Sequence, residues 1–561
     1  MSQPPLLPLA DPRSRDDRGH GVAPTASMSP LVALRFARFR LLILIQLANA
    51  VGVWMHVVAA QWILTEAGRS ATEVAAVPAA MSLPFFLLCL PFGALAGRTS
   101  AVRMMCTSTA LSFIANVSAA FLAWHRPGSL WLLLFTVAAI GSGLVALAIA
   151  WQSQIPRLVD RTAVGSAALV DGATFNLARA LGPIAGGLGL SLLGAPATFA
   201  LTAVVFVTCS VCIVGVMPRG PVPDTTREGL VRSIRGGLRF TRHSPWTRRL
   251  ILRLCLFGIP SAALWALLPL VAHQRLALGA EGFGLLFAMV GLGAVGGTAA
   301  LAPVRGRLTV NQFGFVGSVM FAGILLGLAL SPGVWVVAGL LVLGGASWVG
   351  VQSTWMAAAH QVLPDWIRPR IIALILLAFQ GAQAVGALLW GAVADLVGTQ
   401  WALAAAAALM GSAAAGFLRH GLHPSEGIEP EPADVMAPSL GGGVVPEGAI
   451  RVEVTYVPAS GQAAAFLDAV ASLRLSRLRL GASDWELLVD PTRPGEYAET
   501  FPFASWSDYV AAETVRLTVP EERLRVRVRD LVVNEPATRV RGRVTNVSEA
   551  VRLGNGDRST A

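Results

Sequence analysis

The stretch LLILIQLANAVGVWMHVVAAQWIL, residues 41–64, contains no Asp, Glu, Lys or Arg. About 20 apolar residues in a helix cross a hydrocarbon core of about 30 Å, so this stretch predicts a transmembrane helix. Eleven further apolar runs of similar length follow along the chain. These further runs cover residues 74–96, 104–124, 130–152, 165–193, 196–217, 250–272, 282–303, 310–330, 333–356, 371–394 and 399–418. We therefore expect an all-α polytopic membrane protein with twelve transmembrane helices.

The composition agrees with this expectation. Of the 561 residues, 54% are hydrophobic and 13% are charged, whereas a soluble domain carries about 25% charged residues. A soluble enzyme and a disordered chain are therefore excluded. The net charge of +11 suggests nucleic acid as a partner, but most arginines lie between apolar runs without interleaved aromatic residues, so we expect no nucleic-acid partner. The five cysteines lack metal-ligand spacing, so we expect no metal and no cofactor.

The arginines of the loops predict the orientation. One alternate set of loops carries 18 arginines and the other carries 3, and the richer set faces the cytoplasm by the positive-inside rule. We predict a multi-pass protein of the bacterial plasma (inner) membrane with both termini cytoplasmic. Residues 1–29 hold no apolar run of signal-peptide length and are expected to form a disordered cytoplasmic tail.

The long segment 218–249 is predicted to be a cytoplasmic loop between two six-helix halves, residues 30–217 and 250–420. The halves repeat a polar and glycine pattern at a fixed offset. Asn176, Arg179, Gly182 and Gly187 correspond to Gln380, Gln383, Gly386 and Gly391. Parallel six-helix repeats are typical of secondary transporters, whose sites lie at the repeat interface near the bilayer midplane.

The chain changes character after the last span. Residues 421–448 are rich in Pro, Gly and Glu and indicate a linker. Residues 449–545 predict a small α+β cytoplasmic domain, because alternating and helical apolar spacing follow one another in a βαββαβ order typical of a ferredoxin-like fold. We expect one helix around residues 505–530, a final strand near 538–545, and a tail over 546–561.

Several segments resemble the major facilitator superfamily, and in particular its bacterial exporter branch related to the enterobactin exporter, the transmembrane secretion effectors. The matching segments are VGVWMHVVA at 51–59, FNLARALGPIAGG at 175–187, LWALLPL at 264–270 and WGAVAD at 390–395. The core from Gly182 to Gly187 is similar to the antiporter motif of proton-driven drug exporters. The segments RLRLGA at 477–482, ETF at 499–501 and SW at 505–506 resemble an antibiotic-biosynthesis-monooxygenase-like domain.

Two departures from these families change what we expect. Gly97 stands where the superfamily usually has an Asp in the loop between spans two and three, next to Arg98. The soluble domain lacks the histidine usual after its Ser-Trp helix start. Without the Asp at position 97 we do not expect the family's conformational lock through that carboxylate. Without the histidine we do not expect the soluble domain to be an enzyme.

Arg179 is the one arginine deep in a predicted span. A charge at the bilayer centre normally faces a cavity or a partner, so Arg179 either attracts an anionic or carbonyl-rich substrate or bonds to carbonyls of a neighbouring helix. Gln46, Asn49 and His56 fall within about 80° on a helical wheel. The polar and aromatic residues expected to line a substrate cavity are Arg179, Asn176, Asn49, Gln46, Trp265, Gln380 and Gln383.

Asp171 and His56 are candidates for proton coupling, because burial moves a carboxyl pKa toward neutrality and histidine titrates near physiological pH. Each has a plainer interpretation: a solvated helix-end carboxylate for Asp171 and a hydrogen-bonded interior side chain for His56. Asp395 is interpreted as an interfacial carboxylate.

Small residues let helices approach closely. We expect Gly182, Pro183, Gly186, Gly187, Arg98 and Arg103 to take part in conformational gating.

These features and the resemblance together predict a secondary active transporter rather than an enzyme. It would export a small amphipathic organic molecule (a drug, siderophore or secondary metabolite) by alternating access, with proton antiport implied by the resemblance. The alternative is a membrane-anchored enzyme or sensor that acts through the C-terminal domain. The lipid bilayer, protons and the substrate are the expected partners, together with a homodimer through the C-terminal domain.

Overall fold

The apolar runs of the sequence form long helices in a computed structural model of the chain. It describes residues 30–96, 99–125, 129–217, 230–300, 307–330, 333–422, 430–439, 446, 448–489, 491–493 and 495–542. The tails predicted at 1–29 and 546–561, part of the linker, Gly97 and Arg98 lie outside these residues. Helices dominate because backbone polar groups in lipid must find their hydrogen-bond partners within the chain.

The N-terminal half of the bundle contains five helices. They are α1 (Ala37–Glu66), α2 (Ala71–Ala96), α3 (Ala101–His125), α4 (Leu130–Leu158) and α5 (Val164–Val216). The C-terminal half follows α6 (Leu230–His243), which lies within the segment predicted as a loop. Its helices are α7 (Pro245–Leu270), α8 (Ala280–Ala300), α10 (Val310–Leu330), α11 (Val334–Val362), α12 (Arg368–Val397) and α13 (Thr399–Arg419).

Eleven helices in the described part of the chain are long and apolar enough to cross a membrane. The longest, α5, has 53 residues and is interrupted at Gly194, whose φ of 76° and ψ of 170° are not helical. At 1.5 Å per residue, the segments on either side are about 45 Å and about 33 Å long. The predicted count of twelve spans requires both segments to cross.

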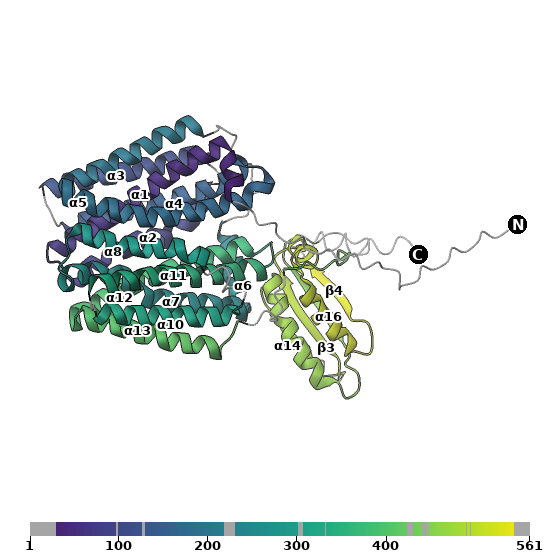
Figure 1. The fold of residues 1–561 in the computed structure, drawn as a ribbon. Coiled ribbons are helices and arrows are strands. Elements are labelled where there is room, and N and C mark those ends of the chain that lie inside the picture. Colours follow the sequence, from purple (N-terminus) through teal and green to yellow (C-terminus); the bar gives the residue numbers. More distant parts are fainter. Residues whose placement is uncertain are drawn as a thin grey trace.

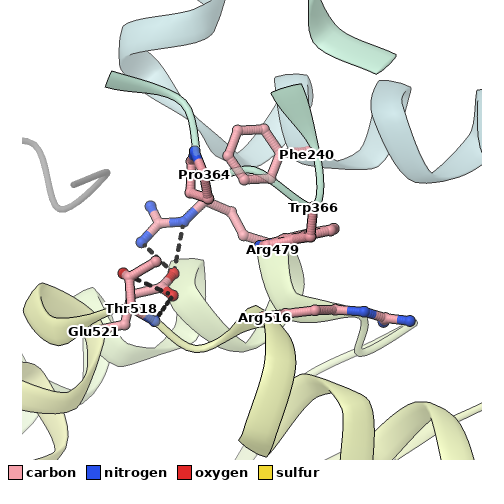
Figure 2. Close-up of a pocket in the computed structure, with 7 residues that line it drawn as sticks. All are labelled: Phe240, Pro364, Trp366, Arg479, Arg516, Thr518 and Glu521. Carbon is pink, nitrogen blue, oxygen red and sulfur yellow. Dashed lines mark hydrogen bonds and ion pairs between the residues drawn. The ribbon is translucent and has the colours of Figure 1, made fainter. Parts of the chain in front are cut away.

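The helices of the two halves lie side by side in the bundle (Figure 1). The C-terminal domain lies at one end, next to α6. Phe240 of α6 packs edge-on against Trp366, with ring centroids 5.9 Å apart. On the domain side, the Arg516 guanidinium lies 5.6 Å from the Trp366 ring centroid. Figure 2 shows this junction, in which Phe240, Pro364 and Trp366 of the bundle meet Arg479, Arg516, Thr518 and Glu521 of the domain.

The C-terminal domain contains a four-stranded antiparallel sheet in the order β2-β3-β1-β4. Its elements are β1 (Ile450–Tyr456), α14 (Ala463–Leu480), β2 (Glu486–Val489), β3 (Tyr497–Phe503), α15 (Trp506–Ala511), α16 (Val519–Asp530) and β4 (Ala537–Gly542). Val452 of β1 lies opposite Phe501 of β3, and both are buried with Phe466 of α14. Along the chain the elements follow a βαββαβ order, with the second helical stretch divided into two helices.

The single helix expected around residues 505–530 is wrong. α15 continues into a π-helical turn over Ala512–Arg516, and a new helix, α16, begins after Thr518. The Thr518 hydroxyl donates to Glu521 at 3.2 Å, and the Glu521 carboxylate also accepts the Thr518 backbone N–H. This capping box starts a helix at a fixed residue, which divides the segment.

Candidate functional site: a caged arginine between two halves

Arg179 lies at the middle of the first segment of α5 and is 6% exposed. Four aromatic rings surround its guanidinium carbon Cζ. The ring centroids lie at 5.3 Å for Trp54, 5.2 Å for Phe175, 5.8 Å for Trp265 and 4.6 Å for Trp348. We call these four rings the aromatic cage. Stacking on aromatic faces stabilises a desolvated guanidinium by about 2 kcal/mol or more per favourable contact.

The cage is built from both halves of the bundle. Trp54 of α1 and Phe175 of α5 belong to the N-terminal half, and Trp265 of α7 and Trp348 of α11 to the C-terminal half. Phe287 of α8 extends the cluster, since its ring lies 5.7 Å from Trp54 and 5.4 Å from Trp265. Any motion that separates the halves must therefore break the contacts of Arg179 with Trp265 and Trp348.

The cage leaves polar hydrogens without partners. Arg179 Nε and Nη1 are buried and have no hydrogen-bond acceptor in the described part of the chain. The same holds for the indole Nε1 of Trp348. Phe175 is 39% exposed and lies one helical turn nearer to the α6 end than Arg179. The cage is therefore incompletely covered on that side.

The other residues predicted to bind substrate lie around this cage to different degrees. Trp265 is part of it. Asn176 adjoins Phe175, but its amide donates to the Gly172 carbonyl at 3.0 Å. Gln380 follows Phe379, whose ring lies 6.2 Å from Trp348. Gln380, Gln383 and Gln46 are half-buried, and Asn49 is buried. Sequence reasoning missed Trp348, Phe175 and the place of Trp54 at Arg179.

The two proton-coupling candidates lie in different places. His56 is fully buried, its Nδ1 2.9 Å from Asn116 Oδ1 and its Nε2 3.2 Å from the Thr136 hydroxyl. These contacts match the plainer interpretation given above, in which His56 is a hydrogen-bonded interior side chain. Asp171 is partly exposed and accepts hydrogen bonds from Trp151 Nε1 at 2.7 Å and Gln152 Nε2 at 3.1 Å. These hydrogen bonds do not connect His56 with Asp171.

The glycines of the 182–187 motif lie where helices meet. A Cβ on Gly182 would clash with the Trp54 Cβ, and one on Gly186 would lie 3.0 Å from the Met55 carbonyl oxygen. On the other face of α5, a Cβ on Gly187 would lie 2.5 Å from the Ala280 carbonyl oxygen of α8. Pro183 takes part through its carbonyl oxygen, which would clash with a Cβ on Gly284 of α8.

A contact between halves that sequence reasoning missed involves Asp395, interpreted above as a plain interfacial carboxylate. Its Oδ1 accepts the backbone N–H of Ala71 at 2.6 Å, and its Oδ2 accepts that of Thr72 at 2.9 Å. Asp395 of α12 thus caps the first turn of α2, which lies at the bundle end opposite the C-terminal domain. Of the arginines predicted to gate, Arg103 is exposed.

The C-terminal domain holds a second buried group of charges. Arg477 lies 3.4 Å from Glu499 and 3.2 Å from Glu513, and Arg525 also pairs with Glu513. The Tyr456 hydroxyl donates to Glu499 at 2.7 Å. Burial and the Glu499 charge both raise the pKa of Tyr456. Each carboxylate is matched by cations or donors, as a stable buried network requires.

A bundle of two helical halves with a buried cation between them is typical of membrane transporters. The chain matches the family described as transmembrane secretion effector over residues 27–550, and it belongs to that family. It is 33% identical over 211 residues to the uncharacterized MFS-type transporter y4rN of Sinorhizobium fredii. That match covers 36% of this chain and only half the length of the relative.

Two further comparisons agree. The multidrug efflux pump Tap of Mycobacterium tuberculosis is 26% identical over 379 residues, which cover 64% of this chain and 87% of Tap. The crystal structure of the nucleoside transporter NupG superposes with a TM-score of 0.56 at 10% identity, covering 68% of this chain and 98% of NupG. This last likeness shows the fold alone. The chain is thus a membrane transporter of the major facilitator type and not an enzyme.

Proposed function

We propose that this transporter is an exporter that moves a small amphipathic organic molecule, such as a drug, siderophore or secondary metabolite, out of a bacterial cell. The observation that carries the proposal is the cage around Arg179, which is buried, unsatisfied in its hydrogen bonding and shared between the halves. Sites of this kind at a repeat interface near the bilayer midplane are typical of secondary transporters. The relation to the efflux pump Tap and the exporter-like motif at 182–187 support the outward direction.

The proposed mechanism is alternating access. Asp395 joins the halves at the end of the bundle away from the C-terminal domain, while Phe175 leaves the cage incompletely covered toward the α6 end. With twelve crossings and both termini cytoplasmic, as the loop arginines favour, this arrangement is closed to the outside. Opening to the outside then requires the Asp395 contact to break and the halves to rock about the cage.

We further propose that protons moving inward drive export. Asp171 is the stronger candidate for the proton carrier, because it is partly exposed and can exchange protons with water. His56 is the second candidate, but its ring nitrogens are both occupied by Asn116 and Thr136. Replacing Asp171 by Asn would leave export running down a substrate gradient while removing its dependence on a pH gradient.

A cross-link across the closed end tests the mechanism. In a variant with the five native cysteines replaced, Thr72→Cys and Asp395→Cys place two thiols across the contact that Asp395 makes with α2. Proteoliposomes of the full chain would be tested for movement of ethidium and of 2-naphthoate driven by a pH gradient. Oxidation is expected to stop the flux and reduction to restore it, while each single-cysteine variant is insensitive to oxidant. Flux that continues in the fully cross-linked protein contradicts alternating access.

The C-terminal domain is proposed to pair two copies of the chain through the outer face of its sheet, as an accessory to transport. Arg451 lies on this face, 3.6 Å from Glu486 of β2, and both side chains are about half exposed. Sedimentation of the full chain in detergent is expected to give a dimer. Arg451→Glu alone, which places like charges on this face, is expected to give a monomer, and a dimer in this variant would reject the sheet as the interface.

A further inference from the structure

The three unsatisfied polar atoms of the cage are all hydrogen-bond donors. Arg179 Nε and Nη1 and Trp348 Nε1 each carry a hydrogen that meets no acceptor in the described part of the chain. Aromatic faces stabilise the positive charge of a guanidinium, but they offer little to N–H groups that point along its plane. The cage therefore supplies shape and charge stabilisation while leaving directed donors for something else to bind.

We infer that the cage binds an organic anion: a carboxylate or comparable oxyanion carried on an aromatic or apolar body. This inference rests on the proposed function, because it assigns the substrate class of the same site. A carboxylate binds two N–H groups from one edge of a guanidinium, so it would use Nε or Nη1 together with Nη2. The rings of Trp54, Trp265 and Phe175 then provide apolar surface for the body of the ligand.

The charges around the cage argue against a cationic substrate. Arg179 forms no ion pair with any carboxylate in the described residues, where its charge is met by rings alone. Asp171 lies eight residues earlier on the same helix, about 12 Å along its axis, and is occupied by Trp151 and Gln152. A cation in the cage would face an uncompensated like charge, and an anion would supply the missing one.

Three probes of one shape separate these possibilities. Equilibrium dialysis of the full chain in nanodiscs would measure binding of 2-naphthoate, 2-naphthamide and 2-naphthylmethylammonium, which share a ring system and differ in charge. Naphthoate is expected to bind at least about tenfold more tightly than the amide, because a site built to hydrogen-bond a group rejects analogues that lack it. The ammonium probe is expected to bind most weakly.

Variants at the cage supply the controls. Arg179→Gln should reduce naphthoate binding to the level of the amide, Arg179→Lys should retain part of the preference, and Trp348→Phe should weaken naphthoate through the lost indole donor. Arg242→Gln, at an exposed arginine of α6, is the matched control and should bind all three probes unchanged. Size-exclusion chromatography and thermal unfolding identify any variant that fails to fold, and the lysine variant then carries the comparison.

Equal or tighter binding of the ammonium probe would overturn the inference, as would naphthoate binding that Arg179→Gln leaves unchanged or that is undetectable at millimolar concentration. These failures differ from a failure of the proposed function. Ammonium flux that stops when the Asp395 end is cross-linked keeps the exporter and rejects the anion. Naphthoate that binds through Arg179 but moves equally well in the cross-linked protein keeps the anion site and rejects alternating access.

Discussion

The carboxylate of Asp395 holds Thr72 twice, accepting its backbone N–H at 2.9 Å and its side-chain hydroxyl at 2.5 Å. Asp395 lies in the last turn of α12 in one half of the bundle, and Thr72 lies in the first turn of α2 in the other. A single side chain therefore caps a helix across the interface. A negative charge at a helix N-terminus is favourable because the free N–H groups there are unsatisfied.

Asp395→Asn is predicted to loosen this end of the bundle. The amide keeps the size of the side chain but loses the charge and one acceptor, a change of about 1–2 kcal/mol, or roughly 5- to 30-fold in the balance between closed and open states. Spin labels on Ala67→Cys and Leu396→Cys, in a background without the native cysteines, would report a larger population of long distances. Asp365→Asn, at an exposed carboxylate near the other end, should leave the distances unchanged.

Gly187→Ala is predicted to destabilise the contact between α5 and α8. The new methyl group would lie 2.5 Å from the Ala280 carbonyl oxygen and 3.1 Å from the Gly284 Cα, both of them backbone atoms that move only with the helix. Overpacking of this kind costs about 1–3 kcal/mol. Gly172→Ala on the same helix meets nothing within 4 Å and serves as the control. Thermal unfolding of both variants in nanodiscs measures the difference, and equal melting temperatures would refute the close contact.

Gly194→Ala is predicted to be destabilising for a different reason. Nothing lies within 4 Å of the added methyl group, but the backbone has a φ of 76° and a ψ of 170°, a region that costs a side-chain-bearing residue about 1–3 kcal/mol. Gly215→Ala, later in the same helix and equally free of contacts, should stabilise by about 0.5–1 kcal/mol through helix propensity. Melting temperatures that shift in the same direction for both variants would contradict the break at Gly194.

The buried charges of the C-terminal domain predict a loss of stability in acid. Burial opposes ionisation of Glu513, but Arg525 and Arg477 outweigh it and lower the pKa of this carboxyl. Because the folded pKa lies below the unfolded value of about 4.3, ionised Glu513 stabilises the domain above that pH. The contribution disappears as the pH falls through the folded pKa.

Glu513→Gln tests this dependence. The variant should lose about 3 kcal/mol of domain stability at neutral pH, because the buried Arg477 loses one of its two carboxylate partners and Arg525 loses its partner. Its stability should vary less with pH below 5. Hydrogen–deuterium exchange of full-length protein, corrected for intrinsic rates and followed in peptides from α14 and β3, measures both effects. Asp468→Asn, at an exposed position of α14, is the control, and an unchanged acid response in Glu513→Gln would reject the explanation.

The sequence predicted the parts of this fold that depend on local pattern. The run at 41–64 became α1 because length and apolarity alone decide a membrane helix, and Val452, Val454 and Tyr456 became a strand because alternate residues face the core. Arg179 was found as a candidate because a charge stands out in an apolar run. What surrounds it was not predictable, since a helix that is apolar on all sides carries no signal for its rotation. The sequence around Trp348 therefore did not predict that its ring lies in the cage.

The contact of Asp395 with α2 was missed for a related reason. Its partners Ala71 and Thr72 lie more than 300 residues earlier, and only the packing of α2 on α12 brings them together. The burial of Glu499 was also not predictable, because it occupies an inward position of β3 that is normally apolar. Arg477, Trp485 and Tyr456 donate hydrogen bonds to it and stabilise its buried charge. Both carboxylates depend on contacts between distant segments.

The C-terminal domain meets the bundle at Phe240, Pro364 and Trp366, which lie in α6 and in the connection from α11 to α12. Pro364 and Trp366 belong to the C-terminal half, and α6 leads directly into it, so the domain is attached to that half. When the halves rock, the domain moves with the half to which it is attached. A rotation of a few degrees at the cage then displaces the distant strands of the sheet by many ångströms. A partner that binds the sheet would then restrain the motion of that half.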